Sequence, residues 1–283
     1  MADEKPKTGN KPDQATIGGI ALAAGGLLGG LLLEKGELRD ISQYTAALIV
    51  LGGTFGATLV STPLPLFIRA LKRIKSVILE KTADPALVIE EMIGYATKAR
   101  KNGLVSLEAE TDAIPDPFLR KALTLAVDGA DIQEIRKMLE LEITIEERHG
   151  DAEAKVLEAA GGFAPTIGII GAVMGLIQVM KHLEDTKEVG HGIAVAFVAT
   201  IYGLVLANIL LLPAAAKMKV RLQHQLQLKE LVLEGVTGIV EGMNPKLIRS
   251  KLEAYAQGST RGAAAKGRAA AGASEAHAAA AGD

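Results

Sequence analysis

The chain has 283 residues, of which 49% are hydrophobic but only 3% aromatic, and its formal net charge is −2. Near neutrality and the lack of aromatic side chains argue against nucleic-acid binding, which needs clustered cations and stacking surfaces. The absence of cysteine excludes disulfides, thiol nucleophiles and cysteine metal sites. The five histidines show no ligand spacing, which argues against a metal site.

Four stretches of the chain contain no Asp, Glu, Lys or Arg. Each is long enough to cross a membrane, because about 20 apolar residues in a helix span a hydrocarbon core of about 30 Å. They predict transmembrane helices over residues 14–33, 43–66, 159–180 and 190–213, paired by short turns. The first stretch lacks a clear cleavage site, so we expect it to be retained. The sequence therefore predicts an all-α integral membrane protein with four spans and a helical cytoplasmic domain between spans two and three.

Basic residues cluster directly after the second and fourth apolar stretches. They are Arg69, Lys72, Arg73, Lys75, Lys217, Lys219 and Arg221. Positive charge beside a span marks its cytoplasmic end, so residues 1–13, 69–158 and 214–257 are expected in the cytoplasm, together with both termini. The flank over 146–158 is mostly acidic, but acids count little in this rule.

The segment between spans two and three is typical of a series of helices. Asp84 followed by Pro85 predicts a helix start, and Gly103 predicts its end. Ser106 is expected to cap the next helix. A short helix is predicted from Pro117 to Val127.

Asp131 with Glu134 forms a capping-box pattern that starts a long helix, which we expect to run into the third span. Beyond the fourth span, residues 218–240 have helical periodicity, and a turn at Asn244 and Pro245 precedes a short amphipathic helix. The tail over 258–283 is rich in Ala and Gly, and we expect it to be disordered.

The spans carry small-residue spacings rather than charges. Four GxxxG pairs are present, and we expect at least two to be packing contacts in an oligomer: Gly25 and Gly29, Gly26 and Gly30, Gly52 and Gly56, Gly171 and Gly175. If the protein moves protons, the titratable carrier must come from a partner, because no span contains an acid or a base of the Lys and Arg type. A scaffold that conducts nothing fits the composition equally well.

Two prolines and two charges have structural explanations as well as functional ones. Pro165 and Pro213 are either tolerated near span ends or mark kinks beside a water-accessible path, and the first explanation suits Pro213 better. Arg100 and Glu108 lie at a helix end and a helix start, where each complements the helix dipole. Taken alone, that explanation suffices for this pair.

The order of these segments resembles MotA, the membrane subunit of the bacterial flagellar stator, over residues 14–255. ARKNGLVSLE (99–108) is similar to the family's rotor-facing segment. EERHGDAEAKVLEAAGGFAPTIGIIGAVMGLIQVM (146–180) resembles its third span and AVAFVATIYGLVLANILLLP (194–213) its fourth, while EGMNPKLIRSKLEAY (241–255) resembles its cytoplasmic end.

The resemblance implies a subunit of the bacterial inner membrane that serves motility and chemotaxis. It would form a ring around a peptidoglycan-anchored MotB-type partner, which supplies the ion-binding aspartate, and would act on a FliG-type rotor protein. By this resemblance Arg100 and Glu108 engage the rotor, with Lys101 as a helper. Pro165, Ala172, Thr200 and Pro213 belong to the ion path and its coupling, and Pro213 ends the fourth span. A subunit of this kind makes and breaks no covalent bonds, so the resemblance implies neither enzymatic activity nor a cofactor.

One departure from the family pattern bears on the ion. Sodium-driven members carry a threonine seven residues after the path proline, where this chain has Ala172. Ala199 likewise lacks a hydroxyl that such members tend to have. Fewer oxygen ligands disfavour a hard cation, so we expect protons, with a sodium-driven stator as an alternative. Ala109 replaces an acid found in some members.

Three other functions compete with this interpretation. An ExbB- or TolQ-like subunit that energises envelope transport would have three spans and an external N-terminus. A plain scaffold would tolerate changes at Pro165 and Glu108. A secondary transporter is disfavoured, because the spans lack intramembrane charge and the chain shows no inverted repeat.

Overall fold

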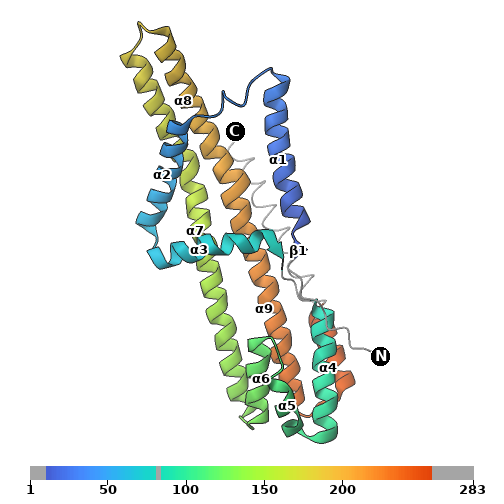
Figure 1. Cartoon of the computed structure of the whole chain (residues 1–283). Coiled ribbons are helices and arrows are strands. Elements are labelled where there is room, and N and C mark those ends of the chain that lie inside the picture. Colours follow the sequence, from blue (N-terminus) through green and yellow to red (C-terminus); the bar gives the residue numbers. More distant parts are fainter. Residues whose placement is uncertain (1–10, 81–83, 257–283) are drawn as a thin grey trace, which may run out of the picture. The chain divides into compact units, whose positions relative to one another are not determined.

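The computed structural model describes residues 11–80 and 84–256, and nearly all of them are helical (Figure 1). The helices are α1 (Gln14–Leu33), α2 (Tyr44–Ser61), α3 (Leu64–Ile78), α4 (Pro85–Asn102), α5 (Glu108–Thr111), α6 (Pro117–Val127), α7 (Ile132–Lys181), α8 (Thr186–Val205) and α9 (Leu212–Val240), and a further helix covers 245–256. A 3₁₀ turn, η1 (Leu104–Leu107), precedes α5, and a π-helical segment, η2 (Leu206–Leu211), joins α8 to α9. The expected tail lies outside the described residues.

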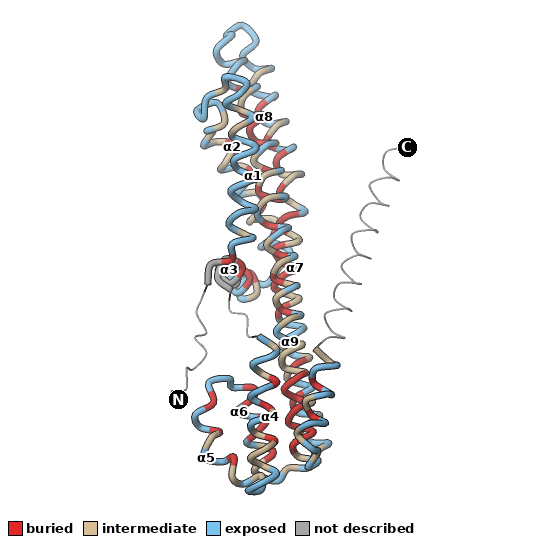
Figure 2. The backbone as a smooth tube through the Cα atoms, turned by 90° about the vertical axis from the view of Figure 1, so that its right-hand side faces the viewer, coloured by how far each residue is buried: buried red, intermediate tan, exposed pale blue. Residues whose placement is uncertain are grey.

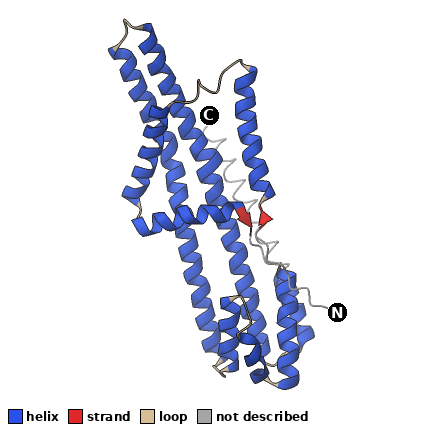
Figure 3. Cartoon of the chain, in the orientation of Figure 1, coloured by secondary structure: helices blue, strands red, loops and turns tan. Residues whose placement is uncertain are grey.

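Strands are confined, within the described ranges, to two residues each. β1 (Lys11–Pro12) pairs antiparallel with β2 (Leu79–Glu80), with Lys11 opposite Glu80 (Figure 3). The sequence pattern did not predict this pairing, because two residues are too few to show alternation.

Four helical segments are long and apolar enough to cross a membrane. They are α1, α2, α7 and the continuous helix Thr186–Val240. The predicted all-α, four-span fold class is therefore confirmed. The turn between the last two is short, since α7 ends at Lys181 and α8 begins at Thr186.

The second span is shorter than the predicted 43–66. Helix α2 ends at Ser61, and Thr62 is extended (φ −136°, ψ 133°) because the ring of Pro63 disfavours a helical residue before it. Residues from Leu64 onward belong to α3 instead. The absence of charge up to Ile68 concealed this break.

The chain divides into two compact units. The membrane unit comprises Met1–Lys81 and Arg148–Leu222, and the polar unit comprises Thr82–Glu147 and Gln223–Asp283. Helices α7 and α9 contribute residues to both. The prediction that the long helix runs on into the third span is thus confirmed, and the fourth span likewise continues through Pro213 without a helix break.

The polar unit starts its helices with aspartate caps. Asp84 accepts a hydrogen bond from the Ala86 N–H, and Asp116 does the same for Phe118. Gly103 ends α4 at a φ of 83°, a conformation that favours glycine. The predicted Ser106 cap is wrong, because its hydroxyl donates to the Gly103 carbonyl instead of accepting an N–H. Buried residues line the facing sides of these helices (Figure 2).

Candidate functional site

Helices α7 and α8 approach each other through glycine. A Cβ added to Gly203 would lie 2.5 Å from the Ala164 carbonyl oxygen, and one on Gly168 would lie 2.9 Å from the Ala199 oxygen. Gly175 is equally close, at 2.7 Å from the Gly192 oxygen. Backbones this close leave no room for a side chain, so these glycines set the distance between the third and fourth spans.

This contact accounts for one of the four predicted GxxxG pairs. Gly171 and Gly175 pack within the chain, against Ala199 and Gly192. The glycines of the other three pairs have no atom within 4 Å of an added Cβ among the described residues. These six glycines therefore pack against no other element that the structure describes.

Pro165 lies inside α7, which continues through it to Lys181. Proline has no N–H, so the Gly161 carbonyl one turn earlier loses its helical donor. Ala172 lies two turns further on the same face, and both side chains are half-buried. Thr200 on α8 donates its hydroxyl to the Ala196 carbonyl at 3.2 Å.

The structure places three of the four predicted ion-path residues along two adjacent turns of the α7–α8 contact. An added Cβ on Gly168 would lie 3.4 Å from Thr200 Cα, so the turn of α7 that follows Pro165 packs on the turn of α8 that carries Thr200. Ala172 follows Gly171, whose added Cβ would lie 2.8 Å from Ala199 Cβ. Pro213 is separate, because thirteen residues of helix place it about 20 Å further along.

Pro213 is preceded by the π-helical segment η2. An extra residue in the turn relieves the clash that proline otherwise makes with the carbonyl four positions earlier. Asn208 lies in this segment and donates its amide to the Leu204 carbonyl at 3.0 Å. Apart from Pro213, no residue pattern in this stretch predicts a π-helix.

The predicted rotor-facing residues lie around the end of α4. Arg100 and Lys101 occupy its last turn, and Glu108 begins α5. All three are exposed, and their side chains make no hydrogen bond or ion pair with any residue that the structure describes. Their neighbours Lys98 and Glu110 instead pair with each other. Three charges are thus left free at one end of the polar unit.

Comparison with known proteins identifies relatives of this chain. Residues 110–231 match the MotA/TolQ/ExbB proton channel family. Motility protein A of Bacillus subtilis is 36% identical over 250 residues, covering 86% of this chain and 90% of that protein. The chain belongs to the MotA/TolQ/ExbB proton channel family.

Solved structures and a further relative narrow the role within this family. The structure of C. jejuni MotAB matches with a TM-score of 0.81 at 31% identity, covering 86% of this chain and 95% of that one. The flagellar MotAB stator complex of Bacillus subtilis matches with a TM-score of 0.78 at 34% identity, covering 85% and 94%. Chemotaxis protein PomA of Vibrio alginolyticus is 32% identical over 237 residues, covering 81% and 92%. These matches support the role of a membrane-embedded flagellar stator subunit.

Beyond the residues taken from the family pattern, Tyr202 fixes the start of α2. Its hydroxyl donates to the Ile41 carbonyl at 2.5 Å and accepts the Gln43 N–H at 3.3 Å. The pattern of the fourth span does not predict this contact, because Tyr202 and Ile41 are 161 positions apart in the chain.

A buried carboxylate holds the beginning of the first span. Asp13, only 6% exposed, accepts the N–H groups of Ala15 and Thr16 and pairs with Lys217 and with Arg221, the latter at 2.8 Å. Burial and the adjacent Arg221 lower the pKa of Lys217, since two cations share one carboxylate. The predicted cytoplasmic-end cations therefore act partly as structural anchors.

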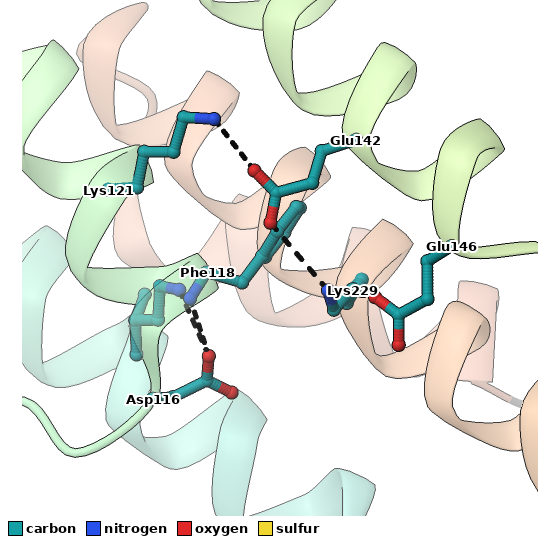
Figure 4. Close-up of polar contacts among 7 residues, drawn as sticks. Asp116, Phe118, Lys121, Glu142, Glu146 and Lys229 are labelled. Carbon is teal, nitrogen blue, oxygen red and sulfur yellow. Dashed lines mark hydrogen bonds and ion pairs between the residues drawn. The ribbon is translucent and has the colours of Figure 1, made fainter. Parts of the chain in front are cut away.

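The polar unit is joined by a charged cluster between α6, α7 and α9 (Figure 4). Lys229 lies 4.7 Å from the centre of the Phe118 ring and pairs with Glu146 and, at 3.7 Å, with Glu142. Glu142 also accepts from Lys121 at 2.7 Å. The cluster is internal to the unit, in contrast to the free charges at 100, 101 and 108.

Proposed function

We propose that this chain and a MotB-type, peptidoglycan-anchored partner form a stator that couples proton flow across the inner membrane to torque on the rotor. The observation that carries the rotor contact is the set of exposed charges at Arg100, Lys101 and Glu108, whose side chains pair with nothing in the described part of the chain. Charges without an internal partner can attract complementary charges on a FliG-type rotor protein. The chain itself catalyses no covalent chemistry and needs no cofactor.

The spans support a partner-supplied ion carrier. No Asp, Glu, Lys or Arg occurs in residues 14–33, 43–66, 159–180 or 190–213, so a proton crossing here needs a carboxylate from another chain. Pro165, Ala172 and Thr200 lie on the packed pair α7 and α8, where such a carboxylate would have to pass. Thr200 offers one hydroxyl and Ala172 offers none, which favours a proton over a hard cation.

Self-association into a ring is supported by the first span. Helix α1 has no buried residue along its 20 residues, and its glycines at 25, 26, 29 and 30 have open space before them. Each glycine costs a helix about 1 kcal/mol relative to alanine, a cost that close packing against a neighbouring copy offsets.

The basic residues beside the spans favour a cytoplasmic location for both termini.

Charge reversal tests the rotor contact. Arg100→Glu is expected to impair swimming, and reversing a complementary charge on the rotor protein is expected to restore it in part. The matched control is Lys246→Glu, which changes an exposed lysine of the same unit far along the chain from these charges. Equal swimming by Arg100→Glu and the wild type would refute the contact.

The ion path has two tests of its own. Pro165→Ala is expected to leave the protein in the membrane but cut torque, measured from the rotation of tethered cells, and normal torque would contradict a coupling role.

Swimming speed is expected to be independent of external sodium at constant proton-motive force. A speed that follows sodium would overturn the choice of ion.

A further inference from the structure

Helix α3 lies across the direction of the spans instead of continuing one. Figure 1 shows it running across α7, and Figure 2, turned by a quarter, shows it end-on. It starts at Leu64, three residues after α2 ends at Ser61. Because α2 crosses the membrane, α3 begins where the bilayer ends.

One face of α3 is packed onto the membrane unit. Phe67 and Ala70 are buried with Val156 of α7, and the Phe67 ring meets Phe55 edge-on at 6.2 Å. Arg73 donates to Glu153 at 2.7 Å. These contacts fix which side of the helix faces outward.

The outward face carries an apolar row. Leu64, Ile68 and Leu71 are 58%, 42% and 37% exposed, and their spacing of four and three places them on one line along the helix. In water such a row would be costly, whereas at the boundary between headgroups and acyl chains it is favourable.

A basic row lies beside the apolar one. Arg69 and Lys72 each follow one residue after an apolar member, and Lys75 continues the line. Lys72 and Lys75 are exposed and have no ion pair with any described residue, and Arg69 is 55% exposed with its nearest carboxylate 3.9 Å away. Helix α3 contains no acid, so this face is uniformly positive.

The three basic residues that follow the fourth span already pair with carboxylates. Lys217 and Arg221 pair with Asp13, and Lys219 pairs with Glu158 at 2.8 Å. Among the described basic residues that directly follow the second and fourth spans, Lys72 and Lys75 of α3 are therefore available to an external anion.

We propose that α3 is a binding site for anionic phospholipid headgroups. Arg69, Lys72 and Lys75 contact the phosphates, while Leu64, Ile68 and Leu71 enter the acyl boundary. Long lysine stems suit this arrangement, because they lie along the apolar surface and raise the charge to the headgroups. Only the assignment to the cytoplasmic leaflet rests on the proposed function, and the lipid chemistry does not.

The test uses a fluorescent reporter, since the chain has no tryptophan. The full chain carrying Leu71→Trp is reconstituted into vesicles of phosphatidylcholine with about one third phosphatidylglycerol, a typical anionic surface. Bromine is placed on the acyl chains of one lipid or the other. We expect brominated phosphatidylglycerol to quench more than random mixing allows, with a preference of roughly tenfold at low salt that falls at high salt.

Lysine variants identify the source of the preference. The double variant Lys72→Gln with Lys75→Gln is expected to reduce the preference for phosphatidylglycerol over phosphatidylcholine to near one. The matched control, Lys35→Gln with Lys187→Gln, neutralises one lysine in the connection after α1 and one in the first turn of α8, at the opposite ends of the spans. It is expected to leave the preference unchanged. A second reporter, Leu183→Trp in the turn between α7 and α8, is expected to show no preference.

Two outcomes would overturn the proposal. If neither brominated lipid quenches the Leu71→Trp reporter, the face is covered by protein, such as a second copy of the chain. If both lipids quench equally, the helix touches the bilayer without selecting headgroups. Because the readout needs no rotor, its failure is distinct from a failure of the proposed stator function, which swimming measures.

Discussion

Within each of the two units, a different kind of contact joins the helices. In the membrane unit the third and fourth spans meet backbone to backbone through glycine, as at Gly203 and Gly168. In the polar unit, helices are joined by ion pairs such as Lys229 with Glu146. Lipid offers no hydrophobic drive between helices, so close packing must provide the contact. Water permits both a hydrophobic core and charged links around it.

This difference predicts that the membrane unit is sensitive to added atoms and the polar unit to lost charges. The largest effect is expected at Gly203. Gly203→Ala places a Cβ 2.5 Å from a backbone oxygen, and overpacking of this kind costs about 1–3 kcal/mol or more. We expect a lower melting temperature in detergent and loss of swimming.

Gly190 provides the control on the same helix. An added Cβ there meets nothing within 4 Å, so Gly190→Ala is expected to melt at or above the wild-type temperature. Similar losses for both variants would contradict the idea that backbone contact sets the distance between the spans.

A smaller loss is expected from charge at the edge of the membrane unit. Asp13→Asn removes the buried carboxylate that pairs with the partly exposed Lys217, which we expect to cost about 2 kcal/mol. Thermal unfolding measures it, with Glu184→Gln in an exposed turn as the control. An unchanged melting temperature would show that Asp13 serves only as a helix cap.

In the polar unit, Lys229→Met keeps the side-chain length but removes the charge. Glu146 loses its cation and Phe118 loses its cation–π contact, with an expected cost of about 1–2 kcal/mol. Hydrogen exchange over α6 should quicken while that over α8 stays constant. The exposed Lys246→Met is the control, and equal exchange in both variants would contradict the prediction.

The smallest effect is expected from acid. Burial raises the pKa of Glu234, but hydrogen bonds from Lys251 and Arg136 outweigh it and hold the pKa below its usual 4.5. A lowered folded-state pKa contributes stability above the unfolded value, and that stability is lost as pH falls through the folded value. The polar unit should therefore weaken below about pH 4.5, with a shallower decline in Glu234→Gln. A decline of the same steepness in both proteins would exclude this pair as its cause.

The amino-acid pattern alone predicts the fold class, the pairing of the spans and most helix starts. These follow from local rules, because an uncharged run of about 20 residues or an aspartate before proline acts without reference to distant residues. The break at Pro63 was also local, but the uninterrupted apolar run concealed it. The sequence located the charges at Arg100 and Glu108. That their side chains have no partner among the described residues became visible only in the structure.

Contacts between helices settle which glycines pack within the chain. Gly171 and Gly175 pack against α8, whereas the first span stays uncovered by the described residues. The tertiary structure also joined Tyr202 to Ile41 and Asp13 to Arg221, across 161 and 208 positions. The physical reason is that a packing distance or an ion pair depends on two helices at once. Periodicity within one helix cannot specify which neighbour it meets.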